Sequence, residues 1–323
     1  SCWPARRRRP VDPSKIATSP APASLMLSFL PAPLIGLIAS LLLGLNSLFW
    51  VPILLLVAML KLILPFQAVR RRLDPILVRI AEAWIVCNSG WMALTQNATW
   101  DVQGIAGLDA GGWYLVNCNH QTWADILVLQ HLLTRRIPLL KFFLKRQLLW
   151  VPVMGLAWWA LDFPFMRRHS EDVLSRHPEL RAKDQAATRL ACEKFALIPT
   201  SVMNFCEGTR FTALKHQRQQ SPYRHLLKPK AGGIALAMNV MADKFQAILD
   251  VTIVYPDGAP DFWEFLCGRM KRVRVRVQTL PVPTELARAD YARDPAVREA
   301  FQQWLQRIWQ DKDRQITDLL DAR

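Results

Sequence analysis

The pattern of apolar and polar positions divides the chain into an apolar N-terminal part and a longer region where strand-like and helix-like stretches alternate. Strict alternation over Arg272–Val277 predicts a strand with valines inward and arginines outward. Phe301, Leu305 and Ile308 follow Pro295 at helical spacing and predict a C-terminal helix. The other expected strands are 99–105, 113–116, 200–204 and 249–255, and the other expected helices are 123–133, 171–195 and 231–243. This alternation indicates an α/β domain over residues 73–323, with a central mixed sheet flanked by helices.

The N-terminal part contains no charged side chain between residues 16 and 60. A membrane-spanning helix needs about 20 apolar residues, so this stretch is too long for one straight span and short for two. Asn46, Ser47 and Pro52 lie near its middle and predict a break there. We expect a helical hairpin over residues 25–72 that enters and leaves the membrane on one side. A single span is the alternative, and a buried helix pair of a soluble protein is a third interpretation.

Basic residues flank the apolar stretch on both sides. Arg6 to Arg9 and Lys15 precede it, whereas Lys61 and Arg70 to Arg72 follow it. Cationic flanks tend to remain in the cytoplasm, so we expect both ends and the following domain on the cytoplasmic side. Residues 1–24 combine the basic block with Pro, Ser and Ala and predict a disordered tail.

The charge composition indicates which kind of molecule the protein binds. The 323 residues include 41 Lys and Arg against 26 Asp and Glu, a formal net charge of +15. This excess indicates an anionic partner, which is a nucleic acid, an anionic lipid headgroup or a phosphorylated substrate. The six cysteines are scattered without a Cys-x-x-Cys pair, so we expect neither a zinc site nor a disulfide framework, and a reducing compartment fits.

His120 and Asp125 form the first candidate chemical group, between a strand-like run and a helix-like run. Thr122 is the expected N-cap of the helix, with Asp125 at the third position of a capping box. A carboxylate beside the imidazole fixes its tautomer and leaves the other ring nitrogen free to take a proton from a hydroxyl. The nucleophile is then an alcohol on a substrate. The alternative is purely structural, because Asp is favoured at helix N-termini.

A second candidate segment, Phe-Cys-Glu-Gly-Thr-Arg-Phe-Thr, occupies residues 205–212 after the strand expected at 200–204. Its turn at Gly208, Thr209 and Arg210 offers backbone amides, a hydroxyl and a guanidinium to an anion. Cys206 is a rival nucleophile, but no basic neighbour in the sequence activates it.

Together these segments resemble the signature of the glycerolipid acyltransferases, which include the 1-acylglycerol-3-phosphate (lysophosphatidic acid) acyltransferases. That signature is Asn-His-x-x-x-x-Asp, here from Asn119, followed about 85 residues later by Phe-x-Glu-Gly-Thr-Arg. Residues 165–168 resemble the family's second block, with Arg168 at its arginine and Asp162 where glycine is usual. Residues 230–232 and 251–256 resemble the fourth region. The resemblance covers roughly residues 100–315, and Glu-Gly-Thr-Arg-Phe-Thr is similar to the pattern of bacterial membrane members.

The resemblance implies a membrane-bound O-acyltransferase. Such an enzyme moves a fatty acyl group from acyl-CoA or acyl carrier protein to the sn-2 hydroxyl of 1-acyl-sn-glycerol 3-phosphate, giving phosphatidic acid. His120 would be the general base and Asp125 would orient it. The residues implied in acceptor binding or in support of the site are Asn119, Arg168, Glu207, Gly208, Thr209, Arg210 and Lys230. Glu207 would orient an arginine through a bidentate pair or accept from a glycerol hydroxyl, and Asn119 would support the turn.

Two other functions stay open at this point. One is a remodelling enzyme that acylates another lysophospholipid. The other is a non-enzymatic, membrane-tethered basic protein that binds anionic lipid or nucleic acid, although charge-driven binding does not need His120, Asp125, Glu207 and Arg210 at fixed spacing. We therefore expect a lysophospholipid acceptor, an acyl thioester donor and membrane phospholipids as partners, without nucleic acid. No metal and no cofactor beyond the acyl donor is expected, and the bacterial pattern implies the inner (cytoplasmic) membrane.

The region between the first two family blocks adds one further expectation. Residues 138–150 mix apolar positions with Lys141, Lys145 and Arg146, which predicts a basic amphipathic patch. Such a patch would contact lipid phosphate or a thioester carrier, and plain solvation of the charges is the alternative. Residues 151–159 are apolar and are predicted to line the acyl-chain path or the core.

Overall fold

The computed structural model describes residues 27–64, 66–163, 165–166, 186, 189–190, 192–193, 195, 198–289, 291 and 294–322. The basic tail expected at 1–24, most of the helix expected at 171–195, and Arg168 lie outside the described residues.

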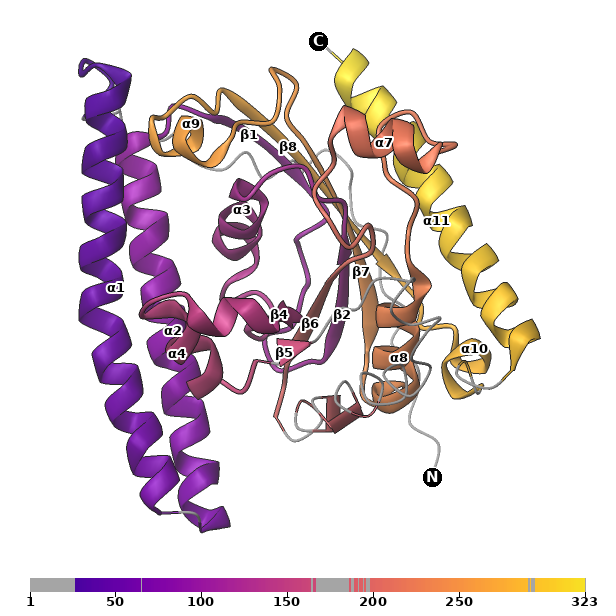
Figure 1. Ribbon diagram of the computed structural model, residues 1–323, viewed down its shortest axis with the longest axis horizontal. Coiled ribbons are helices and arrows are strands. Elements are labelled where there is room, and N and C mark those ends of the chain that lie inside the picture. The colour runs from indigo at the N-terminus through magenta and orange to yellow at the C-terminus, as the bar shows by residue number, and fades with distance from the viewer. Residues whose placement is uncertain are drawn as a thin grey trace.

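A mixed sheet of six strands forms the centre of the molecule, in the order β1–β8–β7–β2–β6–β3 (Figure 1). The strands are β1 (Thr99–Gln103), β2 (Tyr114–Cys118), β3 (Leu140–Phe142), β6 (Ser201–Phe205), β7 (Ala247–Val254) and β8 (Arg272–Leu280). Neighbours pair in parallel except β7 and β8, which are antiparallel. Short strands β4 (Leu144–Lys145) and β5 (Phe165–Met166) form a separate parallel pair. The predicted α/β class with a mixed central sheet is confirmed.

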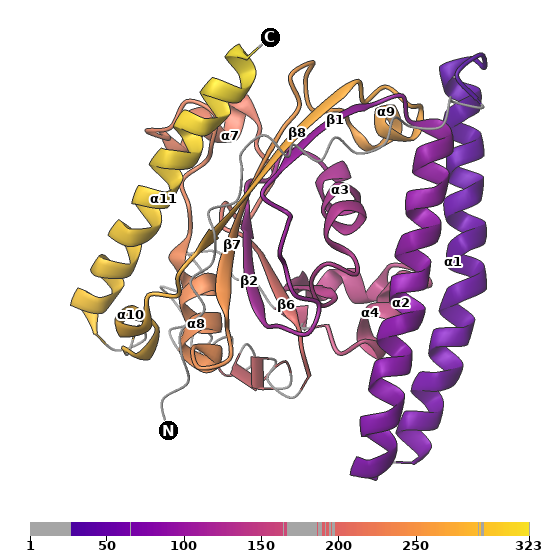
Figure 2. The same cartoon turned by 180° about the vertical axis from the view of Figure 1, so that it is seen from behind.

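Helices cover both faces of the sheet (Figures 1 and 2). The helices on one side are α1 (Ala32–Ile63), α2 (Gln67–Thr95), α3 (Ala124–Leu133), α4 (Met154–Ala160) and α9 (Phe262–Leu266), and those on the other are α7 (Ala213–Gln219), α8 (Ala231–Met241), α10 (Thr284–Arg288) and α11 (Pro295–Asp321). Successive side chains of β2 point to opposite faces of the sheet. Val116 packs in the apolar cluster that includes α3, whereas Leu115 packs in the cluster that includes α8 and α11. The strand period therefore builds two cores from one sheet.

Strand β8 differs from its prediction in the placement of one arginine. Its valines are buried, as expected from the alternation, and Arg272 is exposed. Arg274, however, is buried under the end of α11, where its guanidinium donates to the backbone carbonyls of Leu319 and Ala322. A cation is favoured at a helix C-terminus, so the carbonyls at the end of α11 stabilise the Arg274 guanidinium in place of water.

Helices α1 and α2 pack against each other along the edge of the molecule (Figures 1 and 2). The break predicted near Asn46 and Pro52 is wrong, because α1 continues through Pro52. Asn46 Nδ2 instead donates to Trp84 O (2.9 Å) and Asn88 Oδ1 (2.8 Å) of α2, so this polar position joins two helices. The connection between the helices lies after Ile63, and the boundary expected at residue 72 falls inside α2.

The predicted apolar anchor corresponds to α1. Among the described residues, α1 is the helix that is long and apolar enough to cross a membrane. Many of its large side chains are exposed, including Leu41, Leu48 and Leu56. Near its end, Lys61 Nζ contacts the carboxylates of Asp74 in α2 (2.7 Å) and Asp162 after α4 (2.8 Å). This ion-pair cluster fixes the end of α1 to two other segments.

The basic patch predicted over residues 138–150 is divided between the interior and the surface. Lys141 is buried in β3, with its ammonium 5.1 Å from the centre of the Phe195 ring. Lys145 and Arg146 are exposed. The segment forms strands β3 and β4 and the short 3₁₀ helix η1 (Arg146–Trp150), so the cations of the predicted patch do not share one surface.

A buried ion pair joins α11 to the centre of the sheet. Lys312 Nζ contacts Asp250 Oδ2 of β7 (3.0 Å) and donates to Val251 O (2.6 Å). Asp250 Oδ1 accepts from Asn117 Nδ2 of β2 (3.0 Å). Burial raises the pKa of Asp250, and the Lys312 ammonium and Asn117 amide oppose that rise. The pair depends on both partners, since a buried charge without its counter-ion is strongly unfavourable.

Replacing Lys312 by methionine should lower the free energy of unfolding by about 3–5 kcal/mol, because it leaves the Asp250 carboxylate buried without a cation. Adding Asp250→Asn to Lys312→Met should recover part of the loss. Chemical denaturation in detergent measures both variants, with Lys228→Met as the control at an exposed lysine. Equal stability of Lys312→Met and the control would contradict this account.

Candidate active site

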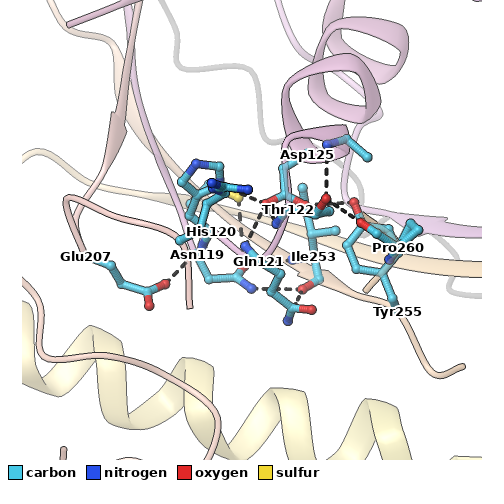
Figure 3. A network of polar contacts seen from close by, with 12 residues as sticks. Asn119, His120, Gln121, Thr122, Asp125, Glu207, Ile253, Tyr255 and Pro260 are labelled. Atoms are coloured by element: carbon cyan, nitrogen blue, oxygen red, sulfur yellow. Dashed lines mark hydrogen bonds and ion pairs between the residues drawn. The ribbon is translucent and has the colours of Figure 1, made fainter. Parts of the chain in front are cut away.

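The candidate site lies where three parallel strands end side by side. Strand β2 pairs in parallel with β6 on one side and β7 on the other, so their C-terminal ends lie at the same edge of the sheet. His120 follows β2, Glu207 follows β6 and Tyr255 follows β7 (Figure 3). Residues far apart in the sequence therefore meet at the carboxyl edge of the sheet, which is where open α/β sheets commonly bind ligands.

The carboxylate of Asp125 is fully buried and is surrounded by donors. Its Oδ2 atom lies 2.9 Å from His120 Nδ1 and accepts from the backbone N–H groups of Gln121 (2.7 Å) and Thr122 (3.0 Å). Its Oδ1 atom accepts from the Tyr255 hydroxyl (2.7 Å). The contact expected between His120 and Asp125 is thus present. A carboxylate that receives Nδ1–H favours the tautomer in which Nε2 can accept a proton.

The helix after His120 begins one residue later than predicted. Ala124 is the first residue of α3, and its N-cap is Trp123 rather than Thr122. Thr122 Oγ1 donates to a backbone carbonyl of the loop after β7 and accepts from Ala124 N (3.4 Å), so this hydroxyl links the start of the helix to that loop. Asp125 is the second helical residue, and its carboxylate turns back to the N–H groups in front of the helix. The expected capping box is therefore replaced by a turn built around Asp125.

Asn119 fixes the backbone before His120. Its Nδ2 donates to Ile253 O and its Oδ1 accepts from Ile253 N, each at 2.9 Å. This pair of bonds continues the pairing of β2 with β7 beyond the end of β2. Because Asn119 is fully buried, its side chain supports the turn, as expected, and is not open to a substrate.

Glu207 holds the backbone of His120 from the opposite side. Its Oε1 accepts from His120 N (2.9 Å) and its Oε2 from Leu227 N (3.0 Å), so both oxygens bind backbone donors and not an arginine, in contrast to one expectation. Phe211 N donates to His120 O (2.7 Å), which satisfies the other backbone group of His120. Burial raises the pKa of Glu207 to about 7, and the two N–H groups only partly offset this effect.

Basic side chains lie around the turn that follows Glu207. Gly208 has a φ of +70°, a left-handed conformation that glycine adopts without strain. The Lys230 side chain lies against Gly208, since a Cβ placed there would be 3.5 Å from Lys230 Cδ. Lys215 Nζ donates to Thr209 Oγ1 (2.8 Å) and to Arg210 O (2.9 Å). Sequence reasoning assigned Lys215 no role, although it follows Arg210 by only five residues.

Arg210 is held beside the His120 turn by an aromatic contact. Its guanidinium carbon lies 4.9 Å from the centre of the Trp123 ring, and both side chains are exposed. Such a stack orients the planar guanidinium while leaving its N–H groups able to bind an anion. Trp123 lies inside the first motif, but it could not be assigned a role from the sequence because its partner is distant in the chain.

A series of aromatic rings leads away from His120. The imidazole stacks on Phe205 with centres 3.9 Å apart and an interplanar angle of 14°. Phe205 lies 6.2 Å from Phe142, which lies 6.4 Å from Phe163 just beyond α4. One side of the site is therefore apolar, whereas the turn at 208–210 makes the other side cationic.

Cys206 lies behind the site and not in it. The side chain is buried and its Sγ contacts the side chain of Asn117 (2.6 Å). Burial raises the pKa of the thiol, and the nearby Asp250 carboxylate raises it further. A nucleophilic cysteine needs an accessible thiolate, so the structure disfavours Cys206 as the rival nucleophile.

Comparisons with known proteins agree with this geometry. Residues 100–256 match the family model described as Acyltransferase. The 1-acyl-sn-glycerol-3-phosphate acyltransferase epsilon of Mus musculus is 24% identical over 63% of this chain and 57% of its own length. The lysocardiolipin acyltransferase 1 of Gallus gallus is 25% identical over 74% of this chain and 62% of its own length. The chain thus spans less than two thirds of these curated relatives.

A solved structure shares the fold. The crystal structure of the 1-acyl-sn-glycerophosphate (LPA) acyltransferase from Thermotoga maritima matches with a TM-score of 0.54 and 15% identity, over 90% of this chain and 98% of that one. The matched family region begins at β1 and ends just after Tyr255, so it includes every residue around His120 described above. Residues 100–256 therefore carry an acyltransferase domain, and the chain is similar over that region to 1-acylglycerol-3-phosphate acyltransferases.

Proposed function

We propose that this protein transfers a fatty acyl group from an acyl thioester to the sn-2 hydroxyl of 1-acyl-sn-glycerol 3-phosphate. The observation that carries the proposal is the contact of His120 Nδ1 with the buried Asp125 carboxylate, at the edge of a cationic turn. The imidazole supplies a base for a hydroxyl, and the cations suit a phosphate. Acyl-CoA and acyl carrier protein both satisfy the requirement for a thioester donor.

The reaction needs one proton acceptor and no covalent enzyme intermediate. His120 Nε2 takes the proton of the acceptor hydroxyl while its oxygen bonds to the thioester carbonyl carbon. The carbon–sulfur bond of the tetrahedral intermediate then breaks, and the departing thiolate takes the proton from His120. Asp125 holds the ring and stabilises the imidazolium that exists between these steps, and Tyr255 fixes the other carboxylate oxygen. Atoms and charge balance to an ester and a free thiol.

The acceptor phosphate is proposed to bind at the turn of residues 208–210. Arg210 offers a planar pair of donors, and Lys230 lies beside Gly208. Lys215 contacts the same turn and adds positive charge, while its bonds to Thr209 and Arg210 stabilise the turn itself. Arg168 is proposed for the same set on the resemblance alone. The series from Phe205 to Phe163 provides an apolar wall for an acyl chain.

A remodelling reaction on another lysophospholipid is the second candidate. The chicken lysocardiolipin acyltransferase aligns with 74% of this chain, a larger share than the mouse epsilon enzyme covers. Both reactions use the same base and thioester donor, so the proposed mechanism serves either one. Parallel assays with lysophosphatidic acid, other lysophospholipids and both donor types distinguish them.

Helix α1 is proposed to lie along the membrane surface. Gly36 packs against Cys267 and Trp263 at α9, whereas Lys61 binds Asp162 after α4. These attachments are about 38 Å apart along the helix axis at 1.5 Å per residue, longer than the hydrocarbon core of about 30 Å. A perpendicular crossing would draw the attached α/β domain into the bilayer. An orientation along the interface keeps that domain on one side, proposed here as the cytoplasmic side of a bacterial inner membrane.

The first test concerns the base. His120→Ala should lower acyl transfer by about 10²–10⁴-fold, the usual contribution of a positioned general base. The purified full chain is assayed in detergent micelles with labelled acyl-CoA and lysophosphatidic acid. His225→Ala removes an imidazole from the α11 side, where it contacts Thr317, and should leave turnover unchanged. Wild-type turnover in a folded His120→Ala protein would exclude the proposed mechanism.

Glu207→Gln should separate stability from activity. The pKa of Glu207 is raised from 4.5 to about 7, so its contribution to stability is present below pH 4.5 and is lost as pH rises through 7. Glutamine does not ionise, so the variant does not lose this contribution. The melting temperature of Glu207→Gln minus that of the wild type should therefore increase as the pH is raised from 4.5 to 7. Turnover should nevertheless fall, because one amide oxygen cannot accept from both His120 N and Leu227 N.

Melting curves and turnover from pH 5 to pH 8 measure both effects on one pair of proteins. A difference in melting temperature that is independent of pH would show that Glu207 does not titrate in this window. Unchanged turnover would show that its contact with His120 N does not matter to the reaction.

Arg210→Lys tests acceptor binding. Lysine keeps the charge but loses the planar fork and the stack on Trp123, so the acceptor KM should rise roughly 10- to 100-fold, as expected for loss of a charge-assisted contact. The donor KM should remain near its wild-type value. Arg307→Lys on the exposed face of α11 is the matched control. Equal increases for donor and acceptor would remove Arg210 from the phosphate site.

A further inference from the structure

An exposed apolar loop precedes α4. Trp150, Val151, Pro152 and Val153 are all exposed, and Trp150 is 82% accessible. Consecutive exposed apolar residues are unfavourable in water, so a run of this kind indicates a surface used for binding. The outward face of α4 extends it, because Leu156 and Trp159 are 51% and 50% exposed. Residues 151–159 were predicted to line the acyl path or the core. Gly155 and Ala157 are buried, whereas most of the larger apolar side chains of this segment are exposed.

The loop is held in a defined shape. Met154 N donates to Pro152 O (2.7 Å) and Gly155 N to Val151 O (2.9 Å), which closes the chain into a tight turn. Val153 has a φ of +66°, an unfavourable conformation for a β-branched residue. Only glycine fits at position 155, because a Cβ there would lie 2.0 Å from the carbonyl oxygen of Leu149. The loop therefore has a defined conformation, although exposure of its apolar side chains to water and the positive φ of Val153 are both unfavourable.

The inner face of α4 is fastened to the proposed membrane anchor. Ala157 and Ala160 are buried in a cluster with Val51, Leu54 and Ala58 of α1. Figures 1 and 2 both place α4 beside the α1–α2 pair. The exposed face of α4 therefore continues the apolar surface of α1 toward the rest of the domain. Lys145 and Arg146, which precede the loop, are exposed and suit the anionic surface of a bilayer.

We propose that the surface formed by Trp150, Val151, Val153, Leu156 and Trp159 is a second membrane contact, which inserts into the bilayer interface beside α1. The occupant is lipid and not a second protein, because tryptophan with aliphatic neighbours next to basic residues is the composition of interfacial segments. The contact continues the surface of α1, and this part of the inference rests on the membrane association proposed for that helix. Because Phe163 follows α4 and begins the ring series to Phe205, insertion of this surface brings the apolar side of the site to the bilayer.

A fluorescent label at residue 150 tests insertion directly. The full chain carries Trp150→Cys together with Cys2→Ser and Cys87→Ser, and the label is an environment-sensitive dye. The other four native cysteines are buried and are retained. Gln306→Cys on the exposed face of α11 is the matched control, since α11 lies on the far side of the sheet from α1. The vesicles contain phosphatidylethanolamine and phosphatidylglycerol, with or without a quencher on the acyl chains.

We expect acyl-chain quenchers to suppress the fluorescence of the label at residue 150 several-fold more than that of the label at residue 306. Equal quenching at both positions overturns the proposal. A dye at residue 150 that is shielded equally in detergent and vesicles, without lipid quenching, indicates contact with a second copy of the chain and also overturns it. These readouts do not require acyl transfer, so failure of the proposed reaction remains distinguishable from failure of this contact.

A kinetic test uses Trp150→Ser combined with Leu156→Ser. The KM for acceptor presented in vesicles should rise about tenfold, because each apolar side chain withdrawn from lipid weakens interfacial binding. The kcat with a short-chain acceptor in solution should remain unchanged. Leu320→Ser replaces an exposed leucine of α11 and serves as the control. A double variant with wild-type KM on vesicles contradicts the proposal.

Discussion

The site depends on a buried carboxylate that receives more than one kind of donor. Asp125 binds the imidazole of His120, two backbone N–H groups and the Tyr255 hydroxyl. A buried carboxylate without such partners would be strongly unfavourable, so the surrounding chain is constrained to supply them. Glu207 acts on the backbone of the same histidine, through its N–H group. His120 is therefore fixed at the ring by one buried carboxylate and at the backbone by another.

Buried carboxylates act in opposite ways on the proposed base, His120, and on the rival nucleophile, Cys206. Beside His120, the Asp125 carboxylate would stabilise the imidazolium that the proposed mechanism requires. At Cys206, burial and the Asp250 carboxylate raise the pKa of the thiol and disfavour its thiolate. Lys312 is buried behind these groups and moderates the charge, since its ammonium lowers the pKa of Asp250 and Glu207. Electrostatics thus favours the proposed role of the imidazole and disfavours the cysteine, which lies in the core.

The sequence predicted what local period and motif spacing can specify. The pattern of apolar and polar residues correctly predicted strands β2, β6, β7 and β8. The spacing of His120 and Asp125 correctly predicted that the imidazole and the carboxylate lie in contact. Contacts between distant residues were not accessible, because Tyr255 lies 130 residues after Asp125. Thr122 was predicted as an N-cap from its position before the apolar run, whereas its hydroxyl also donates to a carbonyl far along the chain. The error at Asn46 has the same origin, since its amide binds a second helix and does not end the first.

The departure from the family pattern at Asp162 shows how the anchor and the site are joined. The residue has a φ of +57°, the conformation that glycine adopts readily, and aspartate tolerates it better than most residues. In return its carboxylate binds Lys61 of α1, which also binds Asp74 of α2. The adjacent Phe163 belongs to the ring series that ends at His120. A position where the family pattern has glycine here also carries an ion pair, so charge at Asp162 and ring packing from Phe163 together connect α1 to the surroundings of His120.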